Sequence, residues 1–332
     1  MIAIEAEGLT KVYRNAVTAV DHIDLKVNEG EIFGFLGPNG TGKTTTIKLL
    51  TTLVRPTKGY ARVLGQDVVK NADHVRRLIG TVPQGLSVDD DLTGMSNLIL
   101  SSKLYHVPSN VAKKRVKELL EMVGLTDAAQ RNVETYSGGM RKRLELIVGL
   151  IHQPKILFLD EPTLGLDVQT RSIMWKYIKS LNTNHGITIF LTTHYLEEAD
   201  SLCDRVAIID GGKIKVEGSP LQLKNTLGGD VIDLVVINAD DSVVDMIRKN
   251  NFVRQIDVNN THYRIKVAKG EESLPLLLEQ LNRSGKQVHS VSLKKPTLDE
   301  VFLEHTGKSL RDADEGSDDA RKQIYMTRRM RR

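Results

Sequence analysis

The chain has 332 residues, of which 40% are hydrophobic and 27% charged, and its formal net charge is +4. This length allows two domains with a sizeable core, and so small a charge argues against the strong basic stripe typical of nucleic-acid binding. The one cysteine, Cys203, excludes an internal disulfide. We expect no secretory signal, and no apolar run approaches the roughly 20 residues that span a bilayer.

Short apolar segments rich in Ile, Val and Leu alternate with helical patterns in the first part of the chain. The predicted strands cover residues 2–10, 20–27, 31–37, 61–65, 77–84, 155–162, 186–194 and 205–212, and a predicted helix covers 44–53. Several of these strands are almost continuously apolar, as is typical of strands buried on both faces. The pattern predicts an α/β fold with a mainly parallel central sheet.

Between residues 86 and 150 the strand signal disappears. Amphipathic patterns at 111–125 and 139–151 predict a helical insert there.

A domain boundary is predicted near residues 224–230, where the element order changes. Residues 226–306 give strand, helix, two strands, helix and strand, which is the order of the split-βαβ or ferredoxin-like α+β unit. A terminal helix follows Pro296. We therefore expect a first domain over 1–225, an accessory domain over 226–306, and a charged tail over 307–332 that is disordered.

Residues 37–44 read GPNGTGKT, a complete phosphate-binding loop pattern. Its glycines allow backbone N–H groups to point at phosphates, Lys43 supplies a positive charge, and Thr44 offers a hydroxyl to Mg²⁺. A predicted strand precedes the loop and a predicted helix follows it, as this chemistry requires. The loop predicts binding of a nucleoside triphosphate and its hydrolysis.

Two further sequence elements carry residues suited to binding and hydrolysing the same nucleotide. The strand over residues 155–160 ends in Asp160, which would hold the Mg²⁺, and Glu161 follows where an acid could polarise an attacking water. The sequence YSGGM begins at Tyr136, and Ser137 is placed to cap the next helix, whose start would bind an anion.

These motifs together resemble the ATP-binding cassette (ABC) ATPases over residues 3–225. GPNGTGKT, Gln84 in TVPQG, YSGGM, ILFLDEP, Asp167 in GLD and His194 in FLTTH occur in that family's order and spacing. The resemblance implies the ABC ATPase fold, with antiparallel strands at the N-terminus. The family's most frequent signature is LSGGQ, whereas this chain has YSGGM. The sequence around YSGGM and the segment TLDEVFLEHTG near the end of the chain resemble the daunorubicin-resistance branch of drug exporters.

The resemblance implies roles for individual residues. Tyr13 resembles the aromatic that stacks on adenine, Glu161 the general base, and His194 the residue that holds the γ-phosphate and water in line. Gln84 resembles the residue that contacts the Mg²⁺ and γ-phosphate region and senses the membrane partner. The implied catalytic residues are Lys43, Gln84, Glu161 and His194; the metal residues are Thr44, Gln84 and Asp160; and the ATP-binding residues are Tyr13, Gly37, Pro38, Asn39, Gly40, Thr41, Gly42, Lys43, Thr44, Thr45, Ser137, Gly138, Gly139 and Asp167.

In this family ATP lies between two chains, so the resemblance implies a dimer of this chain, with ATP and Mg²⁺ as cofactors and no nucleic-acid partner. It also implies a separately encoded permease and a peripheral position on the cytoplasmic side of the cell membrane. The favoured hypothesis is the ATPase subunit of an exporter for a drug-like or lipid-like substrate. Two alternatives stay open: an importer ATPase with a C-terminal small-molecule regulatory domain, and a soluble ABC ATPase of translation or DNA repair.

Overall fold

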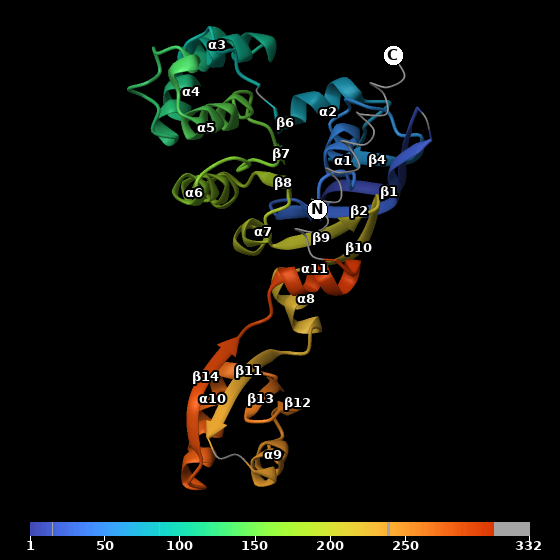
Figure 1. Cartoon of the computed structure of the whole chain (residues 1–332). Helices are drawn as coiled ribbons and strands as arrows, with labels where there is room; N and C mark the ends of the chain where they lie inside the picture. The colour runs from blue at the N-terminus through green and yellow to red at the C-terminus, as the bar shows by residue number, and fades with distance from the viewer. Residues whose placement is uncertain (15, 86, 238–239, 309–332) are drawn as a thin grey trace, which may run out of the picture. The chain divides into compact units, whose positions relative to one another are not determined.

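The computed structural model describes residues 1–14, 16–85, 87–237 and 240–308 (Figure 1). These residues form two compact units, Met1–Gly218 and Ser219–Lys308. The second unit begins a few residues before the expected boundary, because Ser219 and Gln222 form a capping box that starts a new helix. The expected tail lies outside the described residues from 309 onward.

The first unit is built on a six-stranded sheet in the order β10-β9-β3-β8-β7-β6. Its strands are β3 (Ile32–Leu36), β6 (Ile79–Val82), β7 (Ile156–Asp160), β8 (Thr188–Thr193), β9 (Arg205–Asp210) and β10 (Lys213–Gly218). All neighbours pair in parallel except β9 and β10, which are antiparallel. Every residue of β3, β7 and β8 is buried. The predicted mainly parallel sheet is confirmed.

A second sheet of the first unit is antiparallel, in the order β2-β1-β4-β5. It contains β1 (Ile2–Tyr13), β2 (Val17–Asn28), β4 (Lys58–Val63) and β5 (Gln66–Asp67). Helix α1 (Lys43–Leu50) contacts strands of both sheets, and one hydrophobic core joins them, including Leu9, Phe35 and Ile47. This core fixes the start of α1 beside the ends of the parallel strands.

The strand predicted over residues 77–84 was too long. Residues 72–78 form helix α2 (Ala72–Leu78), whose first turn pairs Asp73 with Arg76, and β6 starts only at Ile79. Apolar side chains on one face of a short helix give the same local pattern as a strand end.

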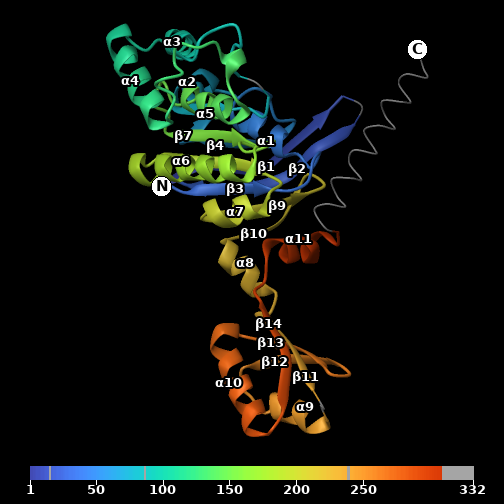
Figure 2. The ribbon, with the colours of Figure 1, turned by 60° about the vertical axis from the view of Figure 1, so that its left-hand side comes forward.

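The region predicted as a helical insert is helical. It contains α3 (Gly94–Leu104), α4 (Ser109–Met122), a 3₁₀ turn (Val133–Thr135) and α5 (Gly138–Val148), and Figure 1 shows these helices gathered in one lobe beside the sheet. Inside the lobe the hydroxyl of Tyr136 donates to the carbonyl of Ala128 at 2.7 Å. Helix α7 (Leu196–Leu202) packs on β3 and β8, and α6 (Val168–His185) packs on α7 (Figure 2).

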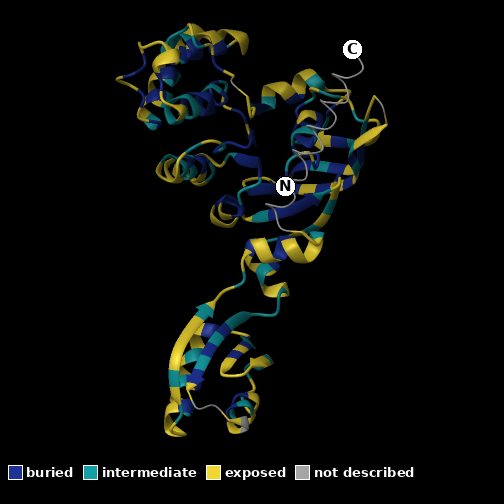
Figure 3. Ribbon diagram, in the orientation of Figure 1, coloured by how far each residue is buried: buried dark blue, intermediate teal, exposed yellow. Residues whose placement is uncertain are grey.

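The second unit has the predicted order of strands and helices. After α8 (Pro220–Thr226) come β11 (Asp230–Ile237), α9 (Asp241–Arg248), β12 (Val253–Asn259), β13 (His262–Val267), α10 (Gly270–Arg283), β14 (Gln287–Lys294) and α11 (Leu298–Thr306). The sheet is antiparallel in the order β12-β13-β11-β14. Its core joins alternate residues of the strands, such as Ile232 and Ile265, to Val243 of α9 and Leu277 of α10. Exposed residues run along β14 (Figure 3).

Over the described ranges, the structure contains no helix that combines the length and the apolar character needed to cross a membrane.

Candidate active site

The phosphate-loop sequence connects β3 to α1, as predicted. A Cβ atom on Gly37 would lie 2.3 Å from the carbonyl oxygen of Ile209, and one on Gly42 would lie 2.2 Å from that of Ala19. Gly42 also has a φ of 109°, which side chains rarely adopt. The hydroxyl of Thr41 donates to the carbonyl of Pro38 at 2.9 Å and closes the turn. The tight backbone therefore requires glycine at both positions.

Lys43 lies at the centre of the site and is only 4% exposed. Its ammonium donates to the carbonyl oxygens of Gly37 at 2.6 Å and Pro38 at 3.1 Å, and it lies 3.1 Å from the carboxylate of Glu161. A buried cation needs such partners because charge is costly to remove from water. The lysine joins the loop to the end of β7.

Asp160 and Glu161 mark the end of β7, beside the end of β8. The hydroxyl of Thr44 donates to Oδ1 of Asp160 at 3.2 Å, and the hydroxyl of Thr192 donates to the same atom at 2.6 Å. The backbone N–H of Glu161 donates to the carbonyl of Thr192 at 3.1 Å. Parallel strands end at the same edge of a sheet, which is why residues far apart in sequence meet here.

Three of the predicted catalytic side chains converge on Glu161, which is 5% exposed. Besides Lys43, the amide nitrogen of Gln84 donates to Oε2 at 3.1 Å, and Nδ1 of His194 lies 3.3 Å from the same oxygen. Burial alone would raise the pKa of Glu161, but His194 and Lys43 outweigh it, so the pKa lies below its ordinary value. The carboxyl is ionised at neutral pH.

The backbone of Glu161 adopts a φ of 52°, in the left-handed region. Residues other than glycine, asparagine and aspartate seldom adopt it. The turn aims the carboxylate back toward Lys43.

The other residues predicted to bind ATP include four at the starts of helices α5 and α6, away from the phosphate-loop sequence. Ser137 caps α5 by accepting from the N–H of Met140 at 3.3 Å, and Gly138 and Gly139 form the first turn. Asp167 caps α6 through Thr170, whose hydroxyl bond lowers the pKa of the carboxyl. Ser137, Gly138 and Asp167 are exposed, and the capping bonds of Ser137 and Asp167 stay within their own helices.

Tyr13 ends β1 and is 39% exposed, with the ammonium of Lys11 5.3 Å from its ring centre. Its strand pairs with β2, which carries the Ala19 carbonyl that touches Gly42. Asn39, Gly40 and Thr45 complete the loop and the first turn of α1. Tyr13 and Gly40 are exposed, and Asn39 and Thr45 are partly exposed.

Several contacts of the site were not predicted from the motifs. Thr192 holds Asp160, and its place at the end of a predicted strand was a usable signal, because neighbouring parallel strands end at the same edge of a sheet. Lys142 contacts the carbonyl of Gln84 at 3.5 Å and the buried Glu145 at 2.9 Å. No motif in the sequence points to that lysine.

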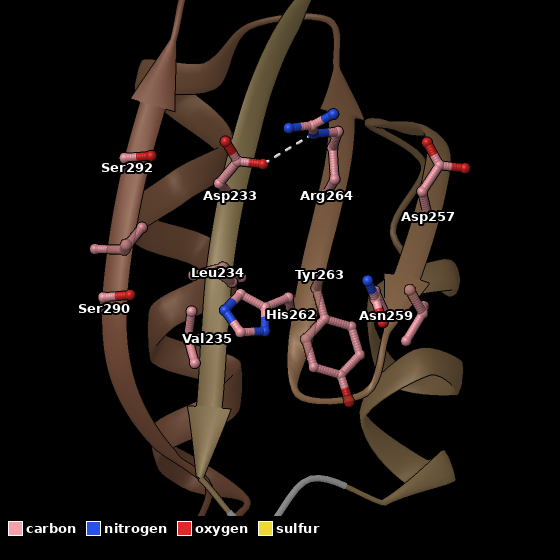
Figure 4. A pocket seen from close by; sticks show the side chains of 12 residues that line it. Asp233, Leu234, Val235, Asp257, Asn259, His262, Tyr263, Arg264, Ser290 and Ser292 are labelled. Atoms are coloured by element: carbon pink, nitrogen blue, oxygen red, sulfur yellow. Dashed lines mark hydrogen bonds and ion pairs between the residues drawn. The ribbon is translucent and has the colours of Figure 1, made fainter.

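The second unit carries a different concave surface, of about 640 Å³, on its sheet. Figure 4 shows Asp233, His262, Arg264, Ser290 and Ser292 on it, with Nε of Arg264 donating to Asp233 at 3.1 Å. Nζ of Lys294 donates to the other oxygen of Asp233 at 2.7 Å. None of the residues predicted for the active site lines it.

Two family models match the chain. Residues 20–164 match "ABC transporter", and residues 218–306 match "ATP-binding protein DrrA1-3-like, C-terminal domain". Together the matches cover the phosphate loop, the Asp160–Glu161 pair and nearly the whole second unit.

Curated relatives match along almost the full length. The chain is 41% identical to the daunorubicin resistance ATP-binding protein DrrA3 of Streptomyces coeruleorubidus, over 93% of this chain and 97% of that protein. It is 37% identical to the linearmycin resistance ATP-binding protein LnrL of Bacillus subtilis, over 93% of this chain and 100% of the relative.

Among solved structures, the chain resembles the ATP-binding cassette MJ0796, solved as a dimer in a post-hydrolysis state with ADP and Pi. The TM-score is 0.60 and the identity 26%, over 65% of this chain and 98% of the other. With the phosphate loop, the Glu161 cluster and both family matches in agreement, the chain belongs to the ABC transporter family as an ATP-binding, ATP-hydrolysing protein with a DrrA-type C-terminal domain.

Proposed function

We propose that this chain is the ATPase subunit of an exporter, which works as a pair of copies bound to a separately encoded permease. The observation that carries the proposal is the convergence of Lys43, Gln84 and His194 on the buried carboxylate of Glu161. This is an arrangement for holding a terminal phosphate next to an acid that can handle a water molecule.

The nucleotide is held by the phosphate loop and the start of α1. The backbone N–H groups of Asn39, Gly40 and Gly42, with the positive end of the helix dipole, attract the phosphates. Lys43 turns its ammonium from the loop carbonyls to the terminal phosphates, and Thr45 adds a hydroxyl at the first turn. The exposed ring of Tyr13 stacks on the adenine.

Mg²⁺ fits the donor set that the chain presents. The hydroxyl of Thr44 and the carboxylate of Asp160 lie 3.2 Å apart, and oxygen ligands of this kind suit the ion. Mg²⁺ bound with a nucleotide takes most of its ligands from phosphates and water. Thr44, Asp160 and Gln84 would hold the ion, and the ion would neutralise charge on the phosphates.

Glu161 orients the attacking water and accepts its proton. Because its pKa is lowered, the carboxylate is ionised when water arrives. His194 lies on the same carboxylate oxygen and keeps the γ-phosphate and the water in line. Gln84 contacts that oxygen too, so its loop is in a position to report the state of the site to a partner protein.

A second copy of the chain completes the site. Ser137, Gly138, Gly139 and Asp167 are predicted to bind ATP, and within one copy they lie at the starts of α5 and α6 rather than on the phosphate loop. A helix start with exposed N–H groups would supply positive potential to the γ-phosphate from the facing copy. The dimeric form of MJ0796 supports this reading.

The names of the relatives support export as the process that ATP hydrolysis drives. They are named for resistance to daunorubicin and linearmycin and for export of Nod factors. We therefore assign a drug-like or lipid-like substrate, and a peripheral position on the cytoplasmic side of the cell membrane, where ATP and the permease meet. None of these three relatives is named for import, translation or DNA repair, so they lend no support to the two alternatives.

Two experiments test the proposal. Phosphate release by Glu161→Gln should fall about a hundredfold or more while ATP binding is kept, with Glu304→Gln, at an exposed position of α11, as the control. Wild-type turnover in Glu161→Gln would refute the catalytic assignment. For export, cells expressing the chain together with a candidate permease should accumulate less daunorubicin than cells expressing Glu161→Gln with the same permease. Equal accumulation would remove this drug from the candidate substrates.

A further inference from the structure

Glu198 is a fully buried acid outside the cluster around Glu161. It lies in the first part of α7, which begins two residues after His194, and its side chain is 0% exposed. Burial is the largest influence on this carboxyl and raises its pKa. A buried carboxyl without partners is costly, and a leucine of similar size would fill the space without that cost. The position therefore calls for an explanation beyond packing.

The contacts of Glu198 reach two other segments of the site. Its Oε1 accepts from the hydroxyl of Thr163 at 2.8 Å and from the indole N–H of Trp175 at 2.9 Å. Thr163 is buried and follows Glu161 by two residues, and Trp175 lies in α6. Among the described residues, Oε2 has no hydrogen-bond partner of normal geometry. One oxygen atom thus joins the turn after Glu161 to α6.

A second link runs beside the first. The guanidinium of Arg171, in α6, lies 4.1 Å from the ring centre of Tyr195, and the Tyr195 ring lies 4.2 Å from that of His194. The same guanidinium donates to the carbonyl of Leu166, next to Asp167, at 3.4 Å. The backbone N–H of Leu166 in turn donates to the carbonyl of Thr163 at 3.2 Å.

We propose that Glu198 is a positioning residue for ATP hydrolysis, whose buried carboxyl group locks the Glu161–Asp167 turn and α6 to the helix that follows His194. The proposal rests on the proposed roles of Glu161, His194 and Asp167. Through Glu198, a shift of His194 toward a bound nucleotide would move the turn that carries Asp167, the residue proposed to face the second copy.

The chain has one tryptophan, and it is a donor to Glu198. Its emission therefore reports on this hydrogen bond. ATP binding at the Glu161 cluster should change the emission of Trp175 when the link is intact.

The test compares Glu198→Ala, Glu198→Gln and Thr163→Val with Glu197→Ala, an exposed neighbour in the same helix. In Glu198→Ala and Thr163→Val, kcat should fall about tenfold or more, while KM for ATP stays near the wild-type value because the phosphate loop is untouched. The ATP-induced change in Trp175 emission should be lost in both. Glu198→Gln should behave like the wild type, since its amide oxygen can accept both hydrogen bonds.

Wild-type kcat and an unchanged emission response in Glu198→Ala would overturn the proposal. So would a Glu198→Gln variant as impaired as Glu198→Ala, because the hydrogen bonds would then not be the cause. If Glu198→Ala does not fold, Thr163→Val decides alone, since it removes one hydroxyl and keeps the acid. Wild-type turnover in Glu161→Gln would instead refute the proposed function, whereas an inactive Glu161→Gln with an unaffected Thr163→Val would refute this inference only.

Discussion

Two carboxylates of this chain each lie beside two basic side chains, but one group is buried and the other is largely open to solvent. Glu161 lies near Lys43 and His194, and Asp233 lies near Arg264 and Lys294. The Glu161 and Lys43 side chains are 5% and 4% exposed, whereas the Asp233 side chain is 28% exposed and its two partners are 61% and 62% exposed. Both pKa values are lowered.

The difference lies in what happens when one partner is lost. A charge left alone in the interior keeps its full desolvation cost, so the buried cluster depends on each member. At the surface, water replaces the missing partner. The comparison teaches that the number of ion pairs says little about their importance, and that burial decides it.

The largest effect is expected at Lys43. In Lys43→Met the buried Glu161 loses its nearest cation and the phosphates lose their point charge, so ATP hydrolysis should fall about a hundredfold or more. Lys294→Met is the matched control on the sheet of the second unit and should leave hydrolysis unchanged. Phosphate release by the two variants measures the contrast, and equal rates would break the comparison.

A smaller effect is expected at Thr192. Thr192→Val keeps the shape but removes the hydroxyl that donates to Asp160, so it should lower turnover about tenfold and the free energy of unfolding by about 1–2 kcal/mol. Ser292→Ala, on the open sheet, serves as the control for loss of a hydroxyl. Denaturant unfolding and phosphate release test both numbers, and a Thr192→Val variant with unchanged turnover would show that Asp160 needs no such support.

A still smaller effect is expected at Asp233. Asp233→Asn removes an exposed ion-pair centre and should lower the free energy of unfolding by less than about 1 kcal/mol. Urea unfolding of the full chain measures this at low and high salt. A loss several times larger would mean that the open sheet face behaves like an interior.

The smallest expected effect is the pH dependence of the difference in unfolding free energy between the wild type and Asp233→Asn. Because hydrogen bonding from Lys294, followed by Arg264, lowers the pKa of Asp233 below 3.8, its stabilisation is complete above that pH and is lost as the pH falls through the folded-state pKa. The gap in unfolding free energy between wild type and Asp233→Asn should therefore close on acidification from about pH 6 to below 3.8. A gap that widens in acid would contradict the assigned direction.

The sequence predicted the part of the site that chemistry confines to a fixed spacing. A phosphate loop needs glycines, a lysine and a hydroxyl in order, so residues 37–44 were identifiable, and Lys43, Glu161 and His194 lie together in the structure. The mainly parallel sheet followed from almost continuously apolar strands. The contacts of Thr192, Lys142 and Glu198 could not be predicted in the same way, because an ordinary polar residue acquires its role only when strand ends and helices meet in space.

The left-handed backbone of Glu161 has one more consequence. Glycine would adopt that conformation without the cost of roughly 1–2 kcal/mol that a side chain carries there. Glycine would also leave the buried ammonium of Lys43 without its carboxylate, which costs about 3–5 kcal/mol and outweighs the relief of strain. A laboratory selection for heat resistance alone should therefore keep an acid at position 161 in spite of its strained backbone, and recovery of stabilised glycine variants would show that the strain outweighs the ion pair.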